Sequence, residues 1–514
     1  MDINLSITSF YFLCFYGILL LLYYVLPKRI QWAVLLGGGL LFYLLSGQGF
    51  LILYPLAVGC ICYGAGRIIE NAKDEDDKRK RTGLCLALAG ALGLLAVLKY
   101  ADFFLSMISG AAAAFGGEGI SALNLLVPLG ISYYTFTMLS YVIDIYYGTG
   151  KSAEHFGRFL LFGTWFPALI SGPIMSYQSM EEQFKTPHKF QYDQVVFGMQ
   201  RMLWGFFKKL VISERLALVV NTVFEGYASY EGFYIFVGAV FFVLQLYTDF
   251  SGCMDIVLGL SETFGLILPE NFKTPFFSRS IAEFWRRWHI TLGEWMRSYV
   301  FYPLLRSRIF TSLGKSLRKK LGKKAGKQAT TFLAMFLLWF AVGIWHGPDW
   351  KYVLGSGLIH WCYIVVGEIG EPLFDRTKQL LHIGKDSKLF HIFQSLRTFL
   401  LVAFAFLFFR APSVSAAFVM IRNLFSKWNP GVIFGETLFT LGLDWVEMTI
   451  VIVSLLILLA VSLLQERGVN LRQRISRMKL PVRWAIWYAL LFYTILLGQY
   501  GPDFSAAEFI YQGF

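Results

Sequence analysis

The sequence has few charged residues. Only 15% of its 514 residues are charged, whereas a soluble chain of this length carries about a quarter. Apolar residues make up 56% of the chain and the mean hydropathy is +0.56. A water-soluble domain is therefore excluded, and lipid is the predicted solvent.

Several motifs and segment types are missing. There is no G-x-S-x-G elbow, which argues against a hydrolase-type serine nucleophile, and no G-x-x-x-x-G-K-[ST] phosphate loop, which argues against an ATP-driven pump. No internal repeat, low-complexity run or long hydrophilic linker occurs. We therefore predict one membrane domain over residues 1–514.

Cysteine is scarce, with six residues that all lie in apolar stretches and show no metal-ligand spacing beyond one C-x-C pair. We interpret them as small buried side chains, and we predict no metal. The six are Cys14, Cys60, Cys62, Cys85, Cys253 and Cys362.

Long apolar runs are abundant. A helix needs about 20 apolar residues to cross a bilayer. Runs of this length occur at 7–26, 82–100, 232–248, 329–346, 351–367, 396–410, 445–464 and 482–499. The run at 7–26 lacks a basic n-region and a cleavage site, so it predicts a first spanning helix rather than a signal peptide.

Three further apolar segments, 31–46, 50–66 and 158–172, contain Gly or Pro. In lipid, such interruptions are tolerated only where protein or water satisfies the backbone. The predicted fold class is an all-α, multi-pass helical bundle with broken or re-entrant helices.

The net charge of +13 comes from basic residues in short segments between apolar runs. This pattern is typical of positive-inside retention rather than of nucleic-acid binding. Lys28 and Arg29 follow the first run, and basic residues crowd 67–81. The segment 304–327 carries nine basic residues and no acidic one. We predict that these segments are cytoplasmic loops, with the N-terminus outside, and that 304–327 can also contact lipid headgroups.

One histidine lies in an aromatic, amphipathic segment. Ser280 and Glu283 have capping-box spacing, so a helix is predicted to begin there and continue past Met296. His289 then lies on or beside the apolar face, with Trp285 and Trp288 nearby. The segment by itself is compatible both with a structural histidine and with a functional one.

A second histidine ends an apolar span. Gly347 and Pro348 cannot easily continue the helix, so His346 is predicted at its C-terminal end, after Trp345. An ionisable group at such a break is a functional-site hypothesis, although a histidine that caps a helix end is equally compatible with the pattern. Acyl transfer from a thioester to a hydroxyl needs a base, and imidazole suits that task near neutral pH.

These residues stand within a longer ordered set of motifs, which resembles the membrane-bound O-acyltransferases, in the branch of the bacterial alginate O-acetylation membrane protein. The resemblance covers most of the chain. Its motifs are Phe166–Pro167, Ser171–Ile174, Asp249–Gly252 with Asp255, Leu268–Phe272, Phe284–His289, Trp345–Gly347, Phe408–Pro412 and Glu508–Tyr511.

The resemblance implies a helical bundle around a funnel or tunnel in the bacterial plasma membrane. It implies that His346 is catalytic and that His289 is a second active-site histidine. Supporting roles would fall to Trp345, Trp285, Trp288, Asp249, Asp255 and, in the short aromatic tail, Tyr511.

The implied reaction moves an acyl group, acetyl in the first instance, from a cytoplasmic thioester donor to an extracytoplasmic polysaccharide. The donor would be acetyl-CoA or an acyl carrier protein's phosphopantetheine thioester. An extracytoplasmic acyltransferase or SGNH-hydrolase-like protein is the implied partner. The alternatives are D-alanyl transfer to teichoic acid, and a transporter or flippase without acyl-transfer chemistry.

The sequence departs from the resemblance at Pro303–Arg308, which reads Pro-Leu-Leu-Arg-Ser-Arg in place of Pro-Leu-Gly-Gly-Asn-Arg. This departure leaves both histidines in place. The departure concerns the donor or the cytoplasmic contact that this segment is expected to make.

Overall fold

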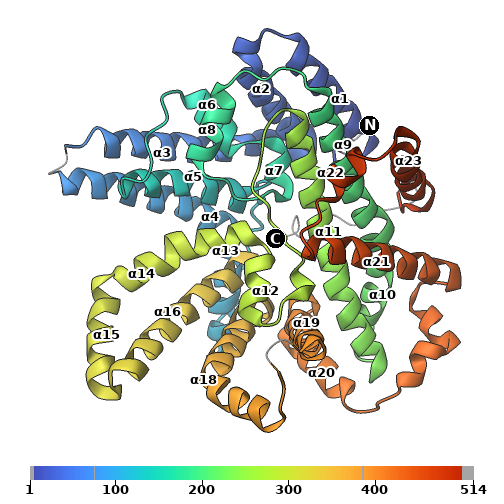
Figure 1. Cartoon of the computed structure of the whole chain (residues 1–514). Coiled ribbons are helices and arrows are strands. Elements are labelled where there is room, and N and C mark those ends of the chain that lie inside the picture. Colours follow the sequence, from blue (N-terminus) through green and yellow to red (C-terminus); the bar gives the residue numbers. More distant parts are fainter. Residues whose placement is uncertain (1–4, 74–75, 385–386, 501–514) are drawn as a thin grey trace. The chain divides into compact units, whose positions relative to one another are not determined.

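The computed structural model describes residues 5–73, 76–384 and 387–500, and in these ranges the chain is helical (Figure 1). A single antiparallel bridge, between Phe272 and Trp288, is the only sheet-like pairing in the described ranges. Helices satisfy their own backbone hydrogen bonds, which suits a chain of this apolarity in lipid.

The helices fall into two compact units. The first unit extends to Met202 and includes Cys253–Pro269. It contains α1 (Phe10–Val25), α2 (Gln31–Tyr43), α3 (Leu53–Glu70), α4 (Asp77–Ala114), α5 (Ile131–Tyr146), α6 (Phe156–Gly163), α7 (Phe166–Ser171), α8 (Tyr177–Lys185) and most of α9 (Tyr192–Phe206).

The second unit comprises Leu203–Gly252 and the described residues from Glu270 onward. Its long helices are α10 (Glu214–Glu225), the first part of α11 (Phe233–Thr263), α15 (Arg308–Leu321), α16 (Lys323–His346), α18 (Ile359–Leu380), α19 (Lys388–Arg410), α20 (Val414–Leu424), α21 (Trp445–Glu466) and α23 (Leu480–Leu497). The shorter ones are α12 (Ile281–Arg287), α13 (Ile290–Met296), α14 (Tyr302–Arg306), α17 (Trp350–Tyr352) and α22 (Leu471–Ser476).

Within the described ranges, nine helices are long and apolar enough to cross a membrane. They are 28–46, 49–70, 77–114, 233–263, 323–346, 350–380, 388–410, 445–466 and 480–497. They include seven of the eight predicted spanning runs and two of the interrupted ones, so the all-α membrane fold is confirmed.

Two predicted segments differ from full spans. The first apolar run forms α1, whose 16 residues are fewer than the roughly 20 that a span needs. The segment 158–172 is broken into α6 and α7, because Thr164 and Trp165 leave helical geometry between them. The prediction of broken helices is confirmed at this segment.

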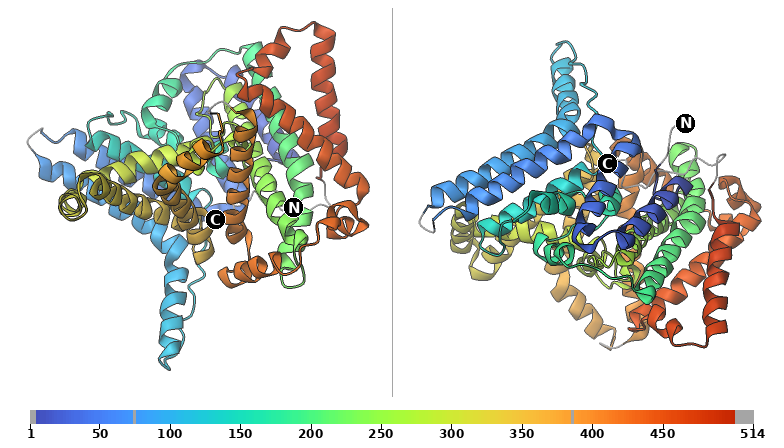
Figure 2. Two further views of the ribbon diagram at one scale, coloured as in Figure 1. Left: turned by 60° about the horizontal axis from the view of Figure 1, so that its bottom comes forward. Right: turned by 90° about the horizontal axis from the view of Figure 1, so that it is seen from above.

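In the first unit, α3 packs lengthwise against both α4 and α5, and the blue pair α3 and α4 runs side by side in both views of Figure 2. A glycine permits close contact between α3 and α4: a Cβ at Gly83 of α4 would lie 2.8 Å from the Ile69 side chain.

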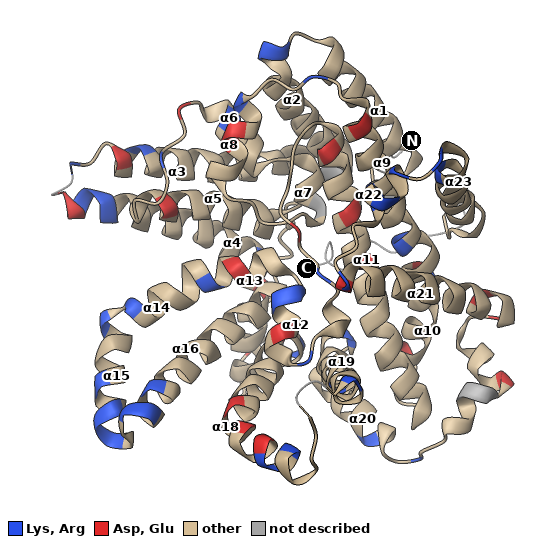
Figure 3. Ribbon diagram, in the orientation of Figure 1, with Lys and Arg blue, Asp and Glu red and all other residues tan. Residues whose placement is uncertain are grey.

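The basic segment 304–327, predicted as a loop between spans, is helical. It forms α14, α15 and the first turn of α16, and Figure 3 shows the Lys and Arg residues gathered along α15 and the start of α16. The chain reverses between these two helices at Gly322, whose φ of +83° a residue with a side chain rarely adopts. Lys, Arg and Leu are good helix formers, which explains why the charge run is helical.

Candidate active site

The predicted continuous helix around His289 is interrupted, and this correction shapes the site. Ser280 Oγ accepts a hydrogen bond from Glu283 N at 3.2 Å, so the predicted helix start is confirmed. The helix then stops at Arg287, Trp288 is extended, and His289 has a φ of +48° before α13 begins. A left-handed backbone at a residue other than glycine is strained, and such strain is typical of functional sites.

Backbone pairing with the upstream segment 271–273 accompanies the interruption. Lys273 N donates to Arg287 O at 2.9 Å, and Ile290 N donates to Asn271 O at 3.0 Å. With the bridge between Phe272 and Trp288, these bonds replace helix bonds across the break. Sequence periodicity reports only on neighbours three and four residues away. It therefore could not predict the pairing with Asn271, which lies 18 residues before His289.

Asn271 organises the His289 imidazole. Its Oδ1 accepts hydrogen bonds from Thr291 N at 3.0 Å and from Thr291 Oγ1 at 3.1 Å. Asn271 Nδ2 lies 3.2 Å and Oδ1 lies 3.3 Å from His289 Nδ1. Because Oδ1 already accepts two hydrogen bonds, we assign Nδ2 as the donor to His289 Nδ1. That assignment leaves the imidazole proton on Nε2. Asn271 was not among the predicted site residues, although it lies in the Leu268–Phe272 motif.

His289 is buried, with 5% of its surface exposed. Burial lowers its pKa from the usual value near 6.5 to about 3, because a charged imidazole loses its hydration. The side chain is therefore neutral near pH 7, where it can donate one hydrogen bond from Nε2 but carries no charge.

The Asp249–Gly252 motif supports His289 from α11. Phe250 places its ring edge on the His289 ring, with centroids 4.8 Å apart and the planes at 88°. Its neighbours bind a π-helical turn, Phe207–Ser213: Lys209 Nζ lies 2.7 Å from Asp249 Oδ1, and Lys208 Nζ donates to Ser251 Oγ at 2.9 Å. The motif thus anchors the ring that contacts His289.

A buried ion cluster completes this support. Lys209 also pairs with Glu214 at 2.7 Å, and Lys209, Glu214 and Asp249 are each at most 2% exposed. A Cβ at Gly252 would lie 3.0 Å from Gly205 O of α9 and 3.3 Å from Lys209 N, so glycine favours this close approach of α11 to the end of α9 and the π-helical turn. Buried charges persist only when paired in this way.

His346 ends α16, as predicted. It is 1% exposed, and Gly347 N closes the helix on Ile344 O at 3.1 Å. The next residues turn the chain into α17. A Cβ at Gly347 would lie 2.5 Å from the Tyr352 ring, so the glycine is needed for close approach rather than for an unusual backbone angle.

Aromatic rings bring the two histidines to one place. The Trp345 indole contacts His346, at 4.9 Å between ring centroids, and His289, at 5.7 Å. Phe409 of α19 covers His346 at 5.5 Å. The predicted association of His289, Trp345 and His346 is therefore present within the second unit.

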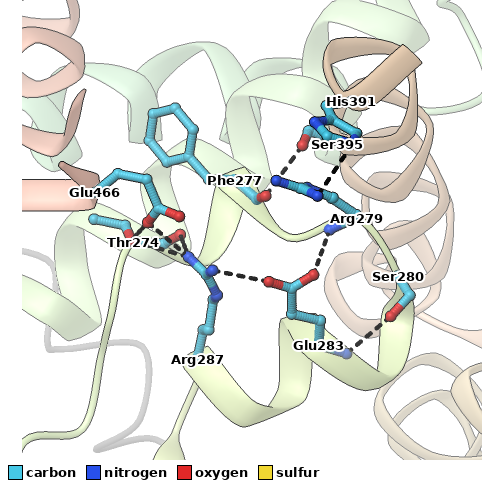
Figure 4. Close-up of polar contacts among 9 residues, drawn as sticks. All are labelled: Thr274, Phe277, Arg279, Ser280, Glu283, Arg287, His391, Ser395 and Glu466. Atoms are coloured by element: carbon cyan, nitrogen blue, oxygen red, sulfur yellow. Dashed lines mark hydrogen bonds and ion pairs between the residues drawn. The ribbon is translucent and has the colours of Figure 1, made fainter. Parts of the chain in front are cut away.

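Figure 4 shows how the first turn of α12 is anchored. Glu283 accepts from Arg279 N at 2.9 Å and pairs with Arg287 at 2.8 Å, and Arg287 also pairs with Glu466 at the end of α21 at 2.7 Å. Arg279 lies 3.2 Å from a ring nitrogen of His391 on α19. These contacts hold the segment that leads to the strained His289.

The other predicted supporting residues make contacts with different partners. Trp288 packs on Phe284 and Phe272, whereas Trp285 contacts Trp339 and a third histidine, His360. Asp255 belongs to the first unit, where it pairs with Arg201 at 2.9 Å. The Tyr511 prediction lies outside the described residues.

His360 is a residue that the sequence reading missed. It is fully buried near the start of α18 among Trp285, Trp339 and Phe406. The available signal was an ionisable residue inside an apolar run, which is a functional-site hypothesis by default. No cluster of three or more His, Cys, Asp or Glu side chains suited to a metal occurs in the described part of the chain.

Known proteins resemble this chain over most of its length. The family description "MBOAT, membrane-bound O-acyltransferase family" matches residues 154–377. The probable alginate O-acetylase AlgI of Azotobacter vinelandii is 30% identical over 79% of this chain and 74% of its own length. The peptidoglycan O-acetyltransferase of Helicobacter pylori is 27% identical over 76% and 73%. The teichoic acid D-alanyltransferase of Bacillus subtilis is 30% identical over 46% and 58%.

The chain therefore belongs to the membrane-bound O-acyltransferase family. It is an O-acyltransferase and a multi-pass protein of the bacterial plasma membrane, as its sequence predicts. The family requires an acyl donor as co-substrate.

Proposed function

We propose that this enzyme transfers an acetyl group from a cytoplasmic thioester to a hydroxyl of an extracytoplasmic cell-surface polysaccharide. The observation that carries the proposal is the pair of buried histidines on one indole, His289 and His346 beside Trp345. Acetyl is preferred to D-alanyl because relatives named as O-acetylases match about 80% of this chain, whereas those named as D-alanyltransferases match under half.

In the proposed reaction, His346 removes the proton of the acceptor hydroxyl as its oxygen attacks the thioester carbonyl carbon. The carbon–sulfur bond then breaks, and the proton passes from His346 to the departing thiolate. Imidazole suits both steps, since it accepts and returns a proton near neutral pH.

His289 has a different proposed role. With Nδ1 accepting from Asn271, the Nε2–H is the proposed donor that stabilises the carbonyl oxygen as negative charge develops there. A neutral donor held by burial and by Asn271 needs no reorganisation at the moment of reaction.

The proposed donor is acetyl-CoA or an acylated carrier protein, and an extracytoplasmic acyltransferase or SGNH-hydrolase-like protein is the proposed partner. The basic residues of α15 and of the start of α16 support an anionic donor, because both candidates carry phosphate or acidic surface.

The test uses purified protein in vesicles with labelled acetyl-CoA or acetylated carrier protein, together with mass spectrometry of surface polymers from cells with and without the protein. We expect ester-linked acetyl groups that depend on the protein. Polymers with unchanged acetyl content, together with no consumption of either donor, would exclude the proposed function. If cells without the protein lose D-alanyl esters rather than acetyl esters, the transferred group is D-alanyl.

A further inference from the structure

A basic pocket of about 240 Å³ lies in the first unit, apart from the residues of the candidate active site. Its walls include Lys28 and Arg29, which join α1 to α2, Trp32 of α2, Arg158 of α6, and Lys185 and His188 at the end of α8. No Asp or Glu is among the described residues that line it.

Most of the positive charge in this pocket is uncompensated. Lys185 pairs with Glu181 at 2.9 Å and with Glu154 at 3.5 Å. Lys28, Arg29 and Arg158 form no ion pair within the described ranges, and the buried Nε of Arg158 makes no hydrogen bond there. A buried guanidinium N–H without an acceptor calls for an explanation, and a bound anion supplies one.

The lining residues of the pocket also contact one another and their neighbours. The Arg158 guanidinium lies over the Trp32 ring at 5.8 Å, and that ring packs against His155 at 4.8 Å. Gln31 donates from Nε2 to His188 O at 2.9 Å and accepts from His188 N at 2.9 Å, which fixes the wall opposite. Arg158 is therefore held in place by aromatic contact, with its donors left for a ligand.

We propose that this pocket binds a phosphate-bearing anion. Three uncompensated cations, two of them guanidinium groups, match a phosphate group, which accepts several charge-assisted hydrogen bonds. Two sources share this chemistry: the headgroup of an anionic phospholipid and a soluble phosphate. Lys28 and Arg29 follow the first apolar helix, where positive-inside retention predicts the cytoplasmic leaflet, so a lipid headgroup would enter there from the side.

The experiment measures ligand binding to the purified full-length chain by native mass spectrometry. The probes are dioctanoyl phosphatidylglycerol, dioctanoyl phosphatidylcholine and inorganic phosphate. A basic residue near an anionic surface contributes about a factor of five in affinity. The variant Lys28→Gln/Arg29→Gln/Arg158→Gln should therefore bind phosphatidylglycerol about 100-fold more weakly than wild type.

The matched control is Arg474→Gln/Arg477→Gln/Lys479→Gln, which removes three exposed cations from the second unit and should bind as wild type does. The double variant Lys28→Gln/Arg29→Gln changes only exposed side chains, so it keeps the test valid if Arg158→Gln disturbs folding. It should lose about 25-fold in affinity.

The arms separate the two sources. Phosphatidylglycerol binding that inorganic phosphate does not displace identifies the lipid headgroup, and displacement at equal concentration identifies soluble phosphate. The proposal is overturned if phosphatidylcholine binds as tightly as phosphatidylglycerol and inorganic phosphate does not bind. Equal binding by the pocket variants and the control also overturns it. Acyl transfer does not enter these readouts, so this test stands apart from the proposed function.

Discussion

The regions around the two histidines are built in different ways. His346 is placed by local structure, since it is the last residue of α16 and the Gly347–Pro348 step ends the helix. His289 is placed by distant contacts, since Asn271 pairs with its backbone neighbours and Phe250 supports its ring. One site thus contains a histidine that its own helix positions and a histidine that contacts distant in sequence position. Substitutions should therefore affect the two regions differently.

The largest effect is expected at His346. His346→Ala should lower the transfer rate by about 10²–10⁴-fold, because it removes the proposed general base. His346→Gln keeps a polar side chain of similar reach but cannot accept the proton, so it should be equally inactive. Initial rates in reconstituted vesicles measure both, with donor binding as the folding control. A folded variant with near wild-type rate would remove His346 from the mechanism.

The next largest effect is expected at the buried ion cluster that supports the His289 region, as a loss of stability. Lys209→Met leaves Asp249 and Glu214 buried without their shared cation, which typically costs about 3–5 kcal/mol of stability. Thermal unfolding in detergent measures the change. Lys378→Met is the control, because it breaks a half-exposed pair with Asp375 and should leave the melting temperature nearly unchanged. Equal melting of the two variants would contradict a structural role for the buried cluster.

The two histidines should differ in activity loss. His289→Ala should lower the rate by about 100-fold, as expected for one lost oxyanion donor, and should leave turnover measurable. Asn271→Leu should lower it in the same direction, because it removes the group that holds the proton on Nε2. Thr291→Val keeps the bond from Thr291 N to Asn271 and serves as the control. A loss at His289 as complete as at His346 would make the two roles equal.

The pH profile sharpens the same distinction. Because burial lowers the pKa of His289 to about 3, this residue stays neutral across pH 5–8. His289→Gln should therefore lower the rate without changing the shape of the profile over that range. In the unfolded chain the His289 imidazole is protonated below about pH 6.5, whereas in the folded chain it stays neutral. As the pH falls below about 6.5, His289 therefore lowers the free energy of unfolding. His289→Gln should show a weaker acid decline in melting temperature, and an unchanged decline would contradict burial as the cause.

The smallest effect is expected at the basic helix. Reversal of Lys315, Lys319 and Lys320 to Glu on α15 should slow transfer several-fold at low salt and much less at high salt, because steering of an anionic donor is screened. The measurement is the transfer rate against salt concentration. Rates that stay unchanged at every salt concentration would show that α15 does not favour donor encounter.

The sequence by itself determined the membrane class, most of the spanning helices and the position of His346 at a helix end. These features follow from composition, apolar length and a Gly–Pro break, all of which act within a few residues along the chain. The start of α12 at Ser280 is predictable for the same reason.

Four features depend on tertiary packing and could not be predicted from the sequence. They are the break at His289, its bond to Asn271, the burial of His360 and the ion cluster of Lys209. Each depends on residues between 5 and 75 positions apart that meet by packing, and hydrophobic periodicity carries no information about such partners. The left-handed backbone at His289 is the plainest case, since its strain is stable only because Asn271, Phe272 and Phe250 hold it from outside its own helix.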